Sequence, residues 1–271
     1  MQMIVRVVLA VIVPVVVSAK VHYAKVEPIE QATIKATVSG TVIRASREAE
    51  GSVLGEAPFV QIDDRLDRAN LHDTNASLHL LRESLALNEE MLSGLQSTFE
   101  RRKGAYERLK DLSSASQSQK DNSFAAYIGA QNQYLATREK IISLKKQILD
   151  LEYKRALLED TIAKKRIAHP GKYLYRLMVR NGEFVAPGAP IAIVQDLTRA
   201  QLIVYLDRSE LVDAEGKKIE SKTIYIDGQP TQLHIDRLWK VADSEYISSY
   251  RARIVLLPKY PFSKLVKIEF K

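Results

Sequence analysis

The middle of the chain carries apolar side chains at regular intervals of seven. The residues of this row are Leu71, Leu78, Leu85, Leu92, Phe99 and Tyr106. A second row, three residues further on, mixes leucines with polar side chains: Thr74, Leu81, Asn88, Leu95, Arg102 and Leu109. A seven-residue repeat keeps one apolar stripe facing a partner helix when the two helices supercoil. The pattern therefore predicts a long helix that buries this stripe, called the seam below, against a second helix.

A second seam follows nearer the C-terminus. Its residues are Ile141, Leu144, Ile148, Leu151, Leu158 and Ile162, and Arg155 interrupts it. Between the seams, residues 113–118 are small and mostly hydroxyl-bearing, and such side chains end helices by competing for backbone hydrogen bonds. Ser118 with Asp121 fits an N-cap box there.

The two arms around this turn, residues 64–113 and 118–166, are nearly equal in length. Equal arms predict an antiparallel hairpin of about 70 Å, with its tip at 113–118. A globular helical bundle is the alternative interpretation. Helices in a bundle, however, usually show more than one apolar stripe.

Glycine-punctuated β segments lie on both sides of the hairpin. The first contains Gly40, Gly51 and Gly55, and the second contains Gly171, Gly182 and Gly188, each with hydrophobic residues at similar spacings. Glycine supplies the positive-φ turns that short strands need. Two copies of one β unit, separated by a helical insertion, predict that both copies pack together at the base of the hairpin.

Further strands are expected after the second β segment. The runs with strand character are 202–206, 222–226, 232–238, 251–257 and 265–270, with Asp227-Gly228 as a hairpin turn and 209–217 as a short helix.

The N-terminus predicts export from the cytoplasm. Residues 7–17 are apolar, follow Arg6, and lead to Val17-Ser18-Ala19, which a signal peptidase accepts. The run is shorter than the roughly 20 residues that cross a bilayer comfortably. A cleaved signal peptide is the favoured interpretation, a retained membrane anchor the second, and a buried strand the third. The chain has no cysteine, which excludes disulfides and a lipoprotein anchor.

Together these segments resemble the periplasmic adaptor, or membrane fusion, proteins of the HlyD and AcrA type. The resemblance implies an α+β fold, in which a long coiled-coil hairpin is inserted in a lipoyl-like (biotinyl-like) β domain that is followed by a small β-barrel. It divides the chain into a signal peptide or anchor (1–19), an N-terminal linker or strand (20–34), the first lipoyl-like half (35–63), the hairpin (64–166), the second half (167–198) and the barrel (199–271).

The resemblance also implies a function. Such an adaptor links an inner-membrane transporter to a TolC-like outer-membrane channel, forms a homo-oligomeric ring, and has neither enzyme activity nor a cofactor. A periplasmic coiled-coil scaffold with no part in transport is the alternative. Lipoyl and biotinyl carriers share the half-motifs, but they need a modifiable lysine where this chain has the hairpin.

Three residues at the hairpin tip are candidates for contact with the channel. Family members resemble one another in an arginine, a leucine four residues on, and a serine seven further. Arg108 and Leu112 keep the first spacing, and Ser118 follows Leu112 by six. Arginine can donate in a fork to carbonyl oxygens, and serine can donate through its hydroxyl. The alternative is that Arg108 is a solvated residue, Leu112 the last seam residue and Ser118 a helix cap.

Charge and remaining chemistry change this interpretation little. The net charge of +7 comes from 40 basic and 33 acidic residues spread along the chain, so nucleic acid is not expected as a partner. His72 and His79 are seven residues apart, too far to share a metal ion, and no catalytic motif appears. No catalytic, cofactor or metal site is predicted.

Overall fold

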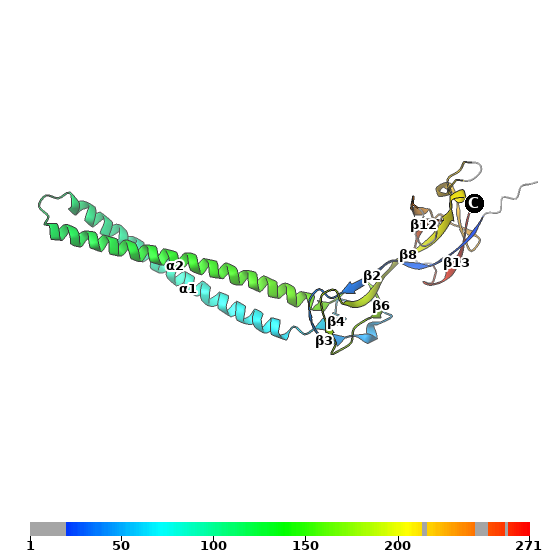
Figure 1. The fold of residues 1–271 in the computed structure, drawn as a ribbon, viewed down its shortest axis with the longest axis horizontal. Coiled ribbons are helices and arrows are strands. Elements are labelled where there is room, and N and C mark those ends of the chain that lie inside the picture. Colours follow the sequence, from blue (N-terminus) through cyan, green and yellow to red (C-terminus); the bar gives the residue numbers. More distant parts are fainter. Residues whose placement is uncertain (1–19, 213–215, 242–248, 258–259) are drawn as a thin grey trace, which may run out of the picture.

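The computed structural model describes residues 20–212, 216–241, 249–257 and 260–271, so the predicted signal peptide or anchor lies outside the described residues. The described chain is elongated, with a helical hairpin at one end and β structure at the other (Figure 1). The fold is therefore mixed, with helices and sheets in separate parts of the molecule.

The hairpin consists of α1 (Arg65–Lys110) and α2 (Gln117–Lys164), which run antiparallel. At 1.5 Å per residue each helix is about 70 Å long. The buried residues of the hairpin lie at the predicted seam positions, with Ala130 in addition: Thr74, Leu78, Asn88, Ala130, Ile141, Leu144, Ile148 and Ile162. The predicted hairpin and its seam are confirmed.

Polar seam positions follow the prediction in part. Asn88 is buried and its side-chain nitrogen donates to the Ser84 carbonyl at 2.6 Å. Thr74 is also buried, whereas Arg102 is exposed. The interrupting Arg155 lies in the seam, and its Nε atom is buried without a hydrogen-bond partner among the described residues.

Strands from both sides of the hairpin form one sheet at its base. The order is β5 (Arg166–Ile167), β4 (Val60–Ile62), β3 (Gly40–Ala45) and β7 (Phe184–Val185), all antiparallel. Val60 lies opposite Ile167 and Gly40 opposite Val185. Side chains from both segments share one core, which we call the base unit: Ala36, Val42, Leu54, Phe59, Val60, Ile62, Ile167, Leu174, Val179, Val185, Ile191, Ala192 and Val194. The two glycine-rich segments therefore pack together, as predicted.

Gly40 shows why glycine is needed in the base unit. Its φ is +154°, and a Cβ atom built there would lie 2.6 Å from Cγ2 of Ile62. Any side chain would therefore force β3 away from β4.

A long two-stranded ribbon leaves the base unit. It consists of β2 (Glu27–Lys35) and β8 (Pro190–Asp207), paired from Lys35 with Pro190 to Glu27 with Gln201. β6 (Tyr173–Leu177) pairs with the first part of β8, and β12 (Ser249–Leu256) pairs with its last part. A single 18-residue strand thus runs through both β regions.

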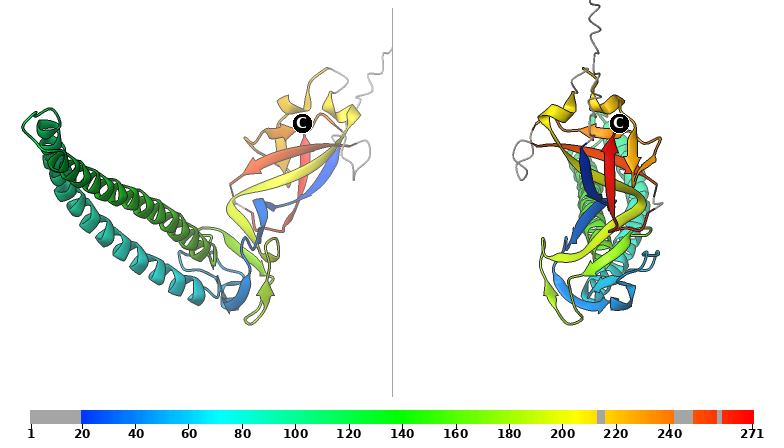
Figure 2. Two further views of the ribbon diagram at one scale, coloured as in Figure 1. Left: turned by 60° about the vertical axis from the view of Figure 1, so that its left-hand side comes forward. Right: turned by 90° about the vertical axis from the view of Figure 1, so that its right-hand side faces the viewer.

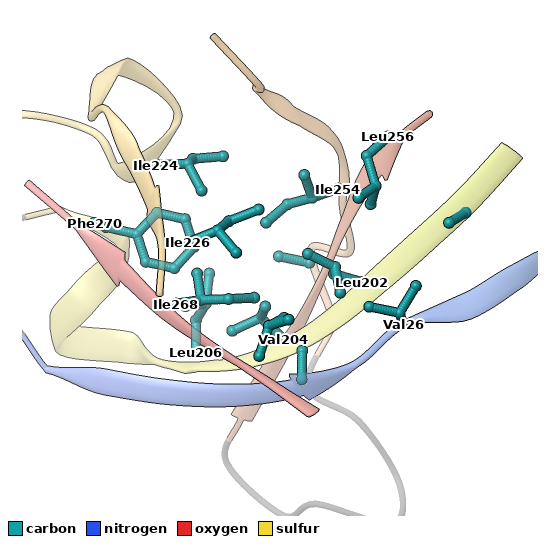
Figure 3. Packing of buried hydrophobic residues seen from close by; sticks show 14 of the residues in the cluster. Val26, Leu202, Val204, Leu206, Ile224, Ile226, Ile254, Leu256, Ile268 and Phe270 are labelled. Carbon is teal, nitrogen blue, oxygen red and sulfur yellow. The ribbon is translucent and has the colours of Figure 1, made fainter. Parts of the chain in front are cut away.

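The far β region, the terminal unit, contains two sheets around one core (Figure 3). One sheet has the order β1 (Val21–Lys25), β13 (Leu265–Phe270), β9 (Ile224–Ile226) and β10 (Gln229–Pro230), and the other adds β11 (Ile235–Leu238) beside β12 and β8. Ile226, Ile254, Leu202 and Ile268 are among the side chains that meet between the sheets. Closure into a β-barrel stays a prediction.

Two sequence predictions in the terminal unit have different outcomes. Asp227 and Gly228, with φ of 51° and 82°, join β9 to β10 in the predicted hairpin turn. The predicted helix over 209–217 is wrong in extent, because α3 (Arg208–Leu211) ends before Val212, which pairs with Lys218 in a β-bridge. None of the described helices is long and apolar enough to cross a membrane.

Candidate functional site: the hairpin, its tip and its base

The hairpin tip is built from a short turn and a capping box. Ser116 caps α2: its Oγ accepts from the Gln119 backbone N–H at 3.3 Å, and the Gln119 side chain accepts from the Ser116 N–H at 2.9 Å. The predicted cap at Ser118 with Asp121 is therefore wrong by two residues. A reciprocal pair with Gln119 satisfies two otherwise unpaired N–H groups.

The three predicted contact residues all lie at this tip and are exposed. Arg108 is in the last turn of α1, and Leu112, with 47% of its surface exposed, is in the turn that follows. Ser118 lies in the first turn of α2, free of the capping role. The structure brings the three to one end of the hairpin; contact with a channel stays a prediction.

An aromatic stack supports the tip from below. Phe99 and Tyr106 of α1 lie against Tyr127 and Tyr134 of α2, with ring centroids 5.7–5.8 Å apart and near-parallel planes in the Phe99–Tyr134 and Tyr106–Tyr127 pairs. Phe124 joins the stack at 5.2 Å from Tyr106. Each such pair contributes about 0.5–1.5 kcal/mol beyond its buried area. The stack therefore holds the two helix ends together behind the tip.

The α2 half of this stack was not predicted from the sequence. Tyr127 and Tyr134 continue the α2 seam by heptads from Ile141, but the intervening seam positions are Ala130 and Thr137. A row in which aromatic residues alternate with small ones stands out less from the rest of the helix than a row of leucines and isoleucines. The interval of seven residues between Tyr127, Tyr134 and Ile141 was the signal that could have identified it.

The outer faces of both helices carry apolar residues that the hairpin does not cover. On α1, Leu80 and Leu87 are each 65% exposed and Met91 is 56% exposed. On α2, Ile142 and Leu149 are 63% and 64% exposed and follow Leu135 at intervals of seven, and Tyr153 and Leu157 are exposed as well. These rows, the outer stripes, are spaced for contact with further helices.

The base of the hairpin is held by a lysine. Lys165 is the C-cap residue of α2, and its Nζ donates to the Asp63 carbonyl at 2.8 Å and forms an ion pair with Asp67 in the first turn of α1. Both charged groups are mostly buried, and each lies where the helix dipole favours its sign. Asp63 also binds Arg65, which lowers the pKa of that carboxyl to about 2.

Other chemistry-bearing residues do not form a site. His79 lies 3.6 Å from Glu83 on an exposed face, and His22 bonds Glu210 at 2.7 Å in the terminal unit. Within the described part of the chain, no three metal-ligating side chains lie close enough to hold an ion. The tip and the outer stripes are therefore the candidate functional surfaces.

Comparison with known proteins gives the fold but no sequence relative. No protein family model matches the sequence, and no curated protein sequence matches it. Among solved structures, MacA from Actinobacillus actinomycetemcomitans is similar with a TM-score of 0.70 at 16% identity, covering 93% of this chain and 78% of that one.

Two further solved structures have a similar fold. A MacA-MexA chimera containing the Pseudomonas aeruginosa MexA α-hairpin domain has a TM-score of 0.56 at 14% identity, over 93% of this chain and 81% of the chimera. The membrane fusion protein Spr0693 from Streptococcus pneumoniae R6 has a TM-score of 0.56 at 6% identity, over 93% and 99%. The chain thus has the fold of the membrane fusion proteins, which confirms the resemblance predicted from its sequence.

Proposed function

We propose that a chain with this membrane fusion fold works as a non-enzymatic periplasmic adaptor, which links an inner-membrane transporter to a TolC-like outer-membrane channel. One observation carries the proposal: a hairpin of about 70 Å projects from the β base and exposes its tip residues and outer stripes. Such a shape spans a distance and offers contacts along its length and at its end (Figure 2). It suits a connector between two partners.

The fold details of the family fit within this proposal. The base unit would be the lipoyl-like domain, since two glycine-rich segments pair across a helical insertion. The terminal unit would be the β-barrel, with its two sheets as the walls. The helices α1 and α2 stand between the two halves, at the place where a lipoyl or biotinyl carrier needs an exposed hairpin turn with a modifiable lysine.

The tip chemistry suits docking onto a protein surface. The Arg108 guanidinium is exposed and can donate two parallel hydrogen bonds to carbonyl or carboxylate oxygens. Leu112 is exposed beside it and can enter an apolar notch, and the Ser118 hydroxyl is free to donate. Each contact is small, because three side chains bury little area.

Several copies acting together would make such weak contacts sufficient. The outer stripes provide apolar surface through which neighbouring hairpins can pack side by side in a ring. Linked tips then bind with an affinity far above that of one tip, since later contacts form at high effective concentration. A ring of adaptors would engage the channel by avidity.

The test is replacement of Arg108 by aspartate in cells that depend on the adaptor. Deletion of the gene should lower the tolerance of these cells for the compounds that the system exports. We expect Arg108→Asp to abolish tolerance of the same compounds, while the circular dichroism spectrum stays unchanged. Arg101→Asp is the matched control, because Arg101 is exposed on the same helix one heptad earlier. Wild-type tolerance in Arg108→Asp would refute docking through the tip. Unchanged tolerance after deletion, with all compounds tested, would favour the scaffold alternative.

A further inference from the structure

The exposed apolar residues of the outer stripes lie mainly in one stretch of the hairpin. Two ion pairs between the helices show which residues lie at the same height: Arg82 with Glu152 at 2.6 Å, and Glu89 with Lys145 at 2.9 Å. In an antiparallel pair, each residue further along α1 lies level with one residue earlier on α2. We call the stretch around these two ion pairs the middle band, which consists of residues 79–96 of α1 and 138–155 of α2.

Exposed apolar residues of the two helices match in height within the middle band. From the two ion pairs, Leu80 of α1 lies within one residue of the height of Tyr153 of α2, and Met91 lies within one residue of the height of Ile142. These four side chains are 65%, 74%, 56% and 63% exposed. Each row faces away from the seam on its own helix, so the two rows do not cover each other within one chain. A second copy beside the first, pointing the same way, can bring its α2 row against the α1 row.

The charges beside the two apolar rows are opposite in sign. On α1, the two ion pairs within the hairpin leave the exposed carboxylates Glu83 and Glu90; Glu83 lies 3.6 Å from His79, and Glu90 forms no ion pair in the described chain. On α2, the exposed charges outside these ion pairs are mostly basic: Arg138, Lys140, Lys146 and Lys154, against Glu139 and Asp150. An α1 face therefore attracts an α2 face, whereas two α1 faces repel each other.

We propose that the α1 face of the middle band binds the α2 face of the middle band of a second copy, with both hairpins pointing the same way and at the same height. The inference rests on the adaptor function proposed above and adds the direction and the register of the contact between neighbours. Each copy uses two different faces, so the contact is heterologous and repeats from copy to copy. A heterologous contact without a shift along the hairpin axis closes into a ring, whereas a shifted one builds a filament.

The chain has no cysteine, so introduced cysteine pairs test the register directly. The matched pair is Met91→Cys with Ile142→Cys in the purified full chain. The offset pair is Met91→Cys with Leu135→Cys, which moves the α2 partner seven residues, about 10 Å, toward the tip. A disulfide forms only when the two Cα atoms lie within about 7 Å. We expect a mild oxidant to convert the matched pair into dimers and higher multimers on a non-reducing gel, and to leave the offset pair monomeric.

Charge reversals in the matched pair test the electrostatic part of the contact. Glu90→Lys should lower the yield of crosslinked multimers at low salt about two- to fivefold, the effect of losing one exposed ion pair. Adding Lys146→Glu should restore the yield, because the two charges then attract again with their signs exchanged. Glu107→Lys is the control, since Glu107 is an exposed carboxylate on α1 outside the middle band, and it should leave the yield unchanged.

Three results would overturn the proposal. One is a matched pair that gives no multimers, or no more than the offset pair. Another is dimer formation by Met91→Cys alone at the yield of the matched pair, which would place α1 against α1. The third is equal loss of yield in Glu90→Lys and Glu107→Lys, since the effect would then come from total charge. The assay contains neither transporter nor channel, so these results leave docking through Arg108 standing, and failure of that docking leaves the crosslinking result standing.

Discussion

Replacing Arg155 by leucine should stabilise the hairpin. Arg155 and Leu78 line the same hollow between the helices, and Leu78 is only 2% exposed. The Nε atom of Arg155 is buried without a hydrogen bond. Its ion pair with Glu159 on the same helix is long, at 3.8 Å, and the Glu159 side chain is exposed. A buried donor without a partner costs about 1–3 kcal/mol, whereas an exposed ion pair on one helix contributes less than about 0.5 kcal/mol.

The balance favours the substitution. Leucine completes the heptad row between Ile148 and Ile162 and removes the buried donor that lacks a hydrogen bond. Because the end of the arginine side chain already reaches solvent, we expect a gain near the lower end of the range, about 1–2 kcal/mol. With a urea dependence of about 2 kcal/mol per molar, the unfolding midpoint should rise by about 0.5–1 M.

The assay is urea unfolding followed by circular dichroism at 222 nm, where the two long helices dominate the signal. Arg138→Leu is the control, since Arg138 is exposed on the same helix and its loss should change stability by less than about 0.5 kcal/mol. A midpoint for Arg155→Leu that is equal to or below that of the parent would refute the reasoning. It would mean that the arginine is stabilised in the seam by an interaction beyond this hairpin.

Three further predictions concern the hairpin base and the two β units. Lys165→Met should lower the free energy of unfolding by about 1–3 kcal/mol, because it leaves a buried carboxylate across the hairpin base unpaired; an unchanged urea midpoint would contradict this. Gly40→Ala should destabilise by about 2–3 kcal/mol, since the new Cβ meets Ile62 at 2.6 Å, whereas Gly94→Ala, in open space on α1, should stabilise by up to about 1 kcal/mol in the same assay. Two flanking lysines lower the pKa of Glu269 to about 2 from 4.5, so its contribution to stability is present above pH 4.5 and is lost as pH falls toward 2. Glu269→Gln should flatten the acid unfolding curve in that window, followed by tryptophan fluorescence, and an identical curve would exclude this role.

The hairpin was predictable because its information is local and periodic. Each seam repeats over several heptads, and the antiparallel order follows from one short polar turn. Even the polar seam residue Asn88 proved buried, since it satisfies itself on the preceding turn. The position of the N-cap was not predictable to the residue, because Ser116 and Ser118 are chemically alike and only the side-chain pairing with Gln119 selects between them.

The pairing of distant strands was harder to derive. Residues 20–34 were expected to form a linker or strand, and they form β1 and β2, which pair with β13 and β8 far along the chain. Which strands pair depends on how their buried side chains pack together in the folded core, and the sequence of one segment does not contain this information. The choice of tip residues came from family resemblance and spacing, whereas the stacking of Arg251 on Trp239 arises from two strands that come together only in the fold.

The 18-residue strand β8 makes the two β units mechanically continuous. Because β8 pairs with β2 and β6 in one unit and with β12 in the other, a rotation of the terminal unit that keeps these ladders intact would turn the base unit with it. The hairpin then acts as a lever: over an arm of about 70 Å, a turn of about 5° moves the tip sideways by about 6 Å, roughly one helical pitch. Small movements close to one partner would thereby become displacements at the other, large enough to shift helices past one another.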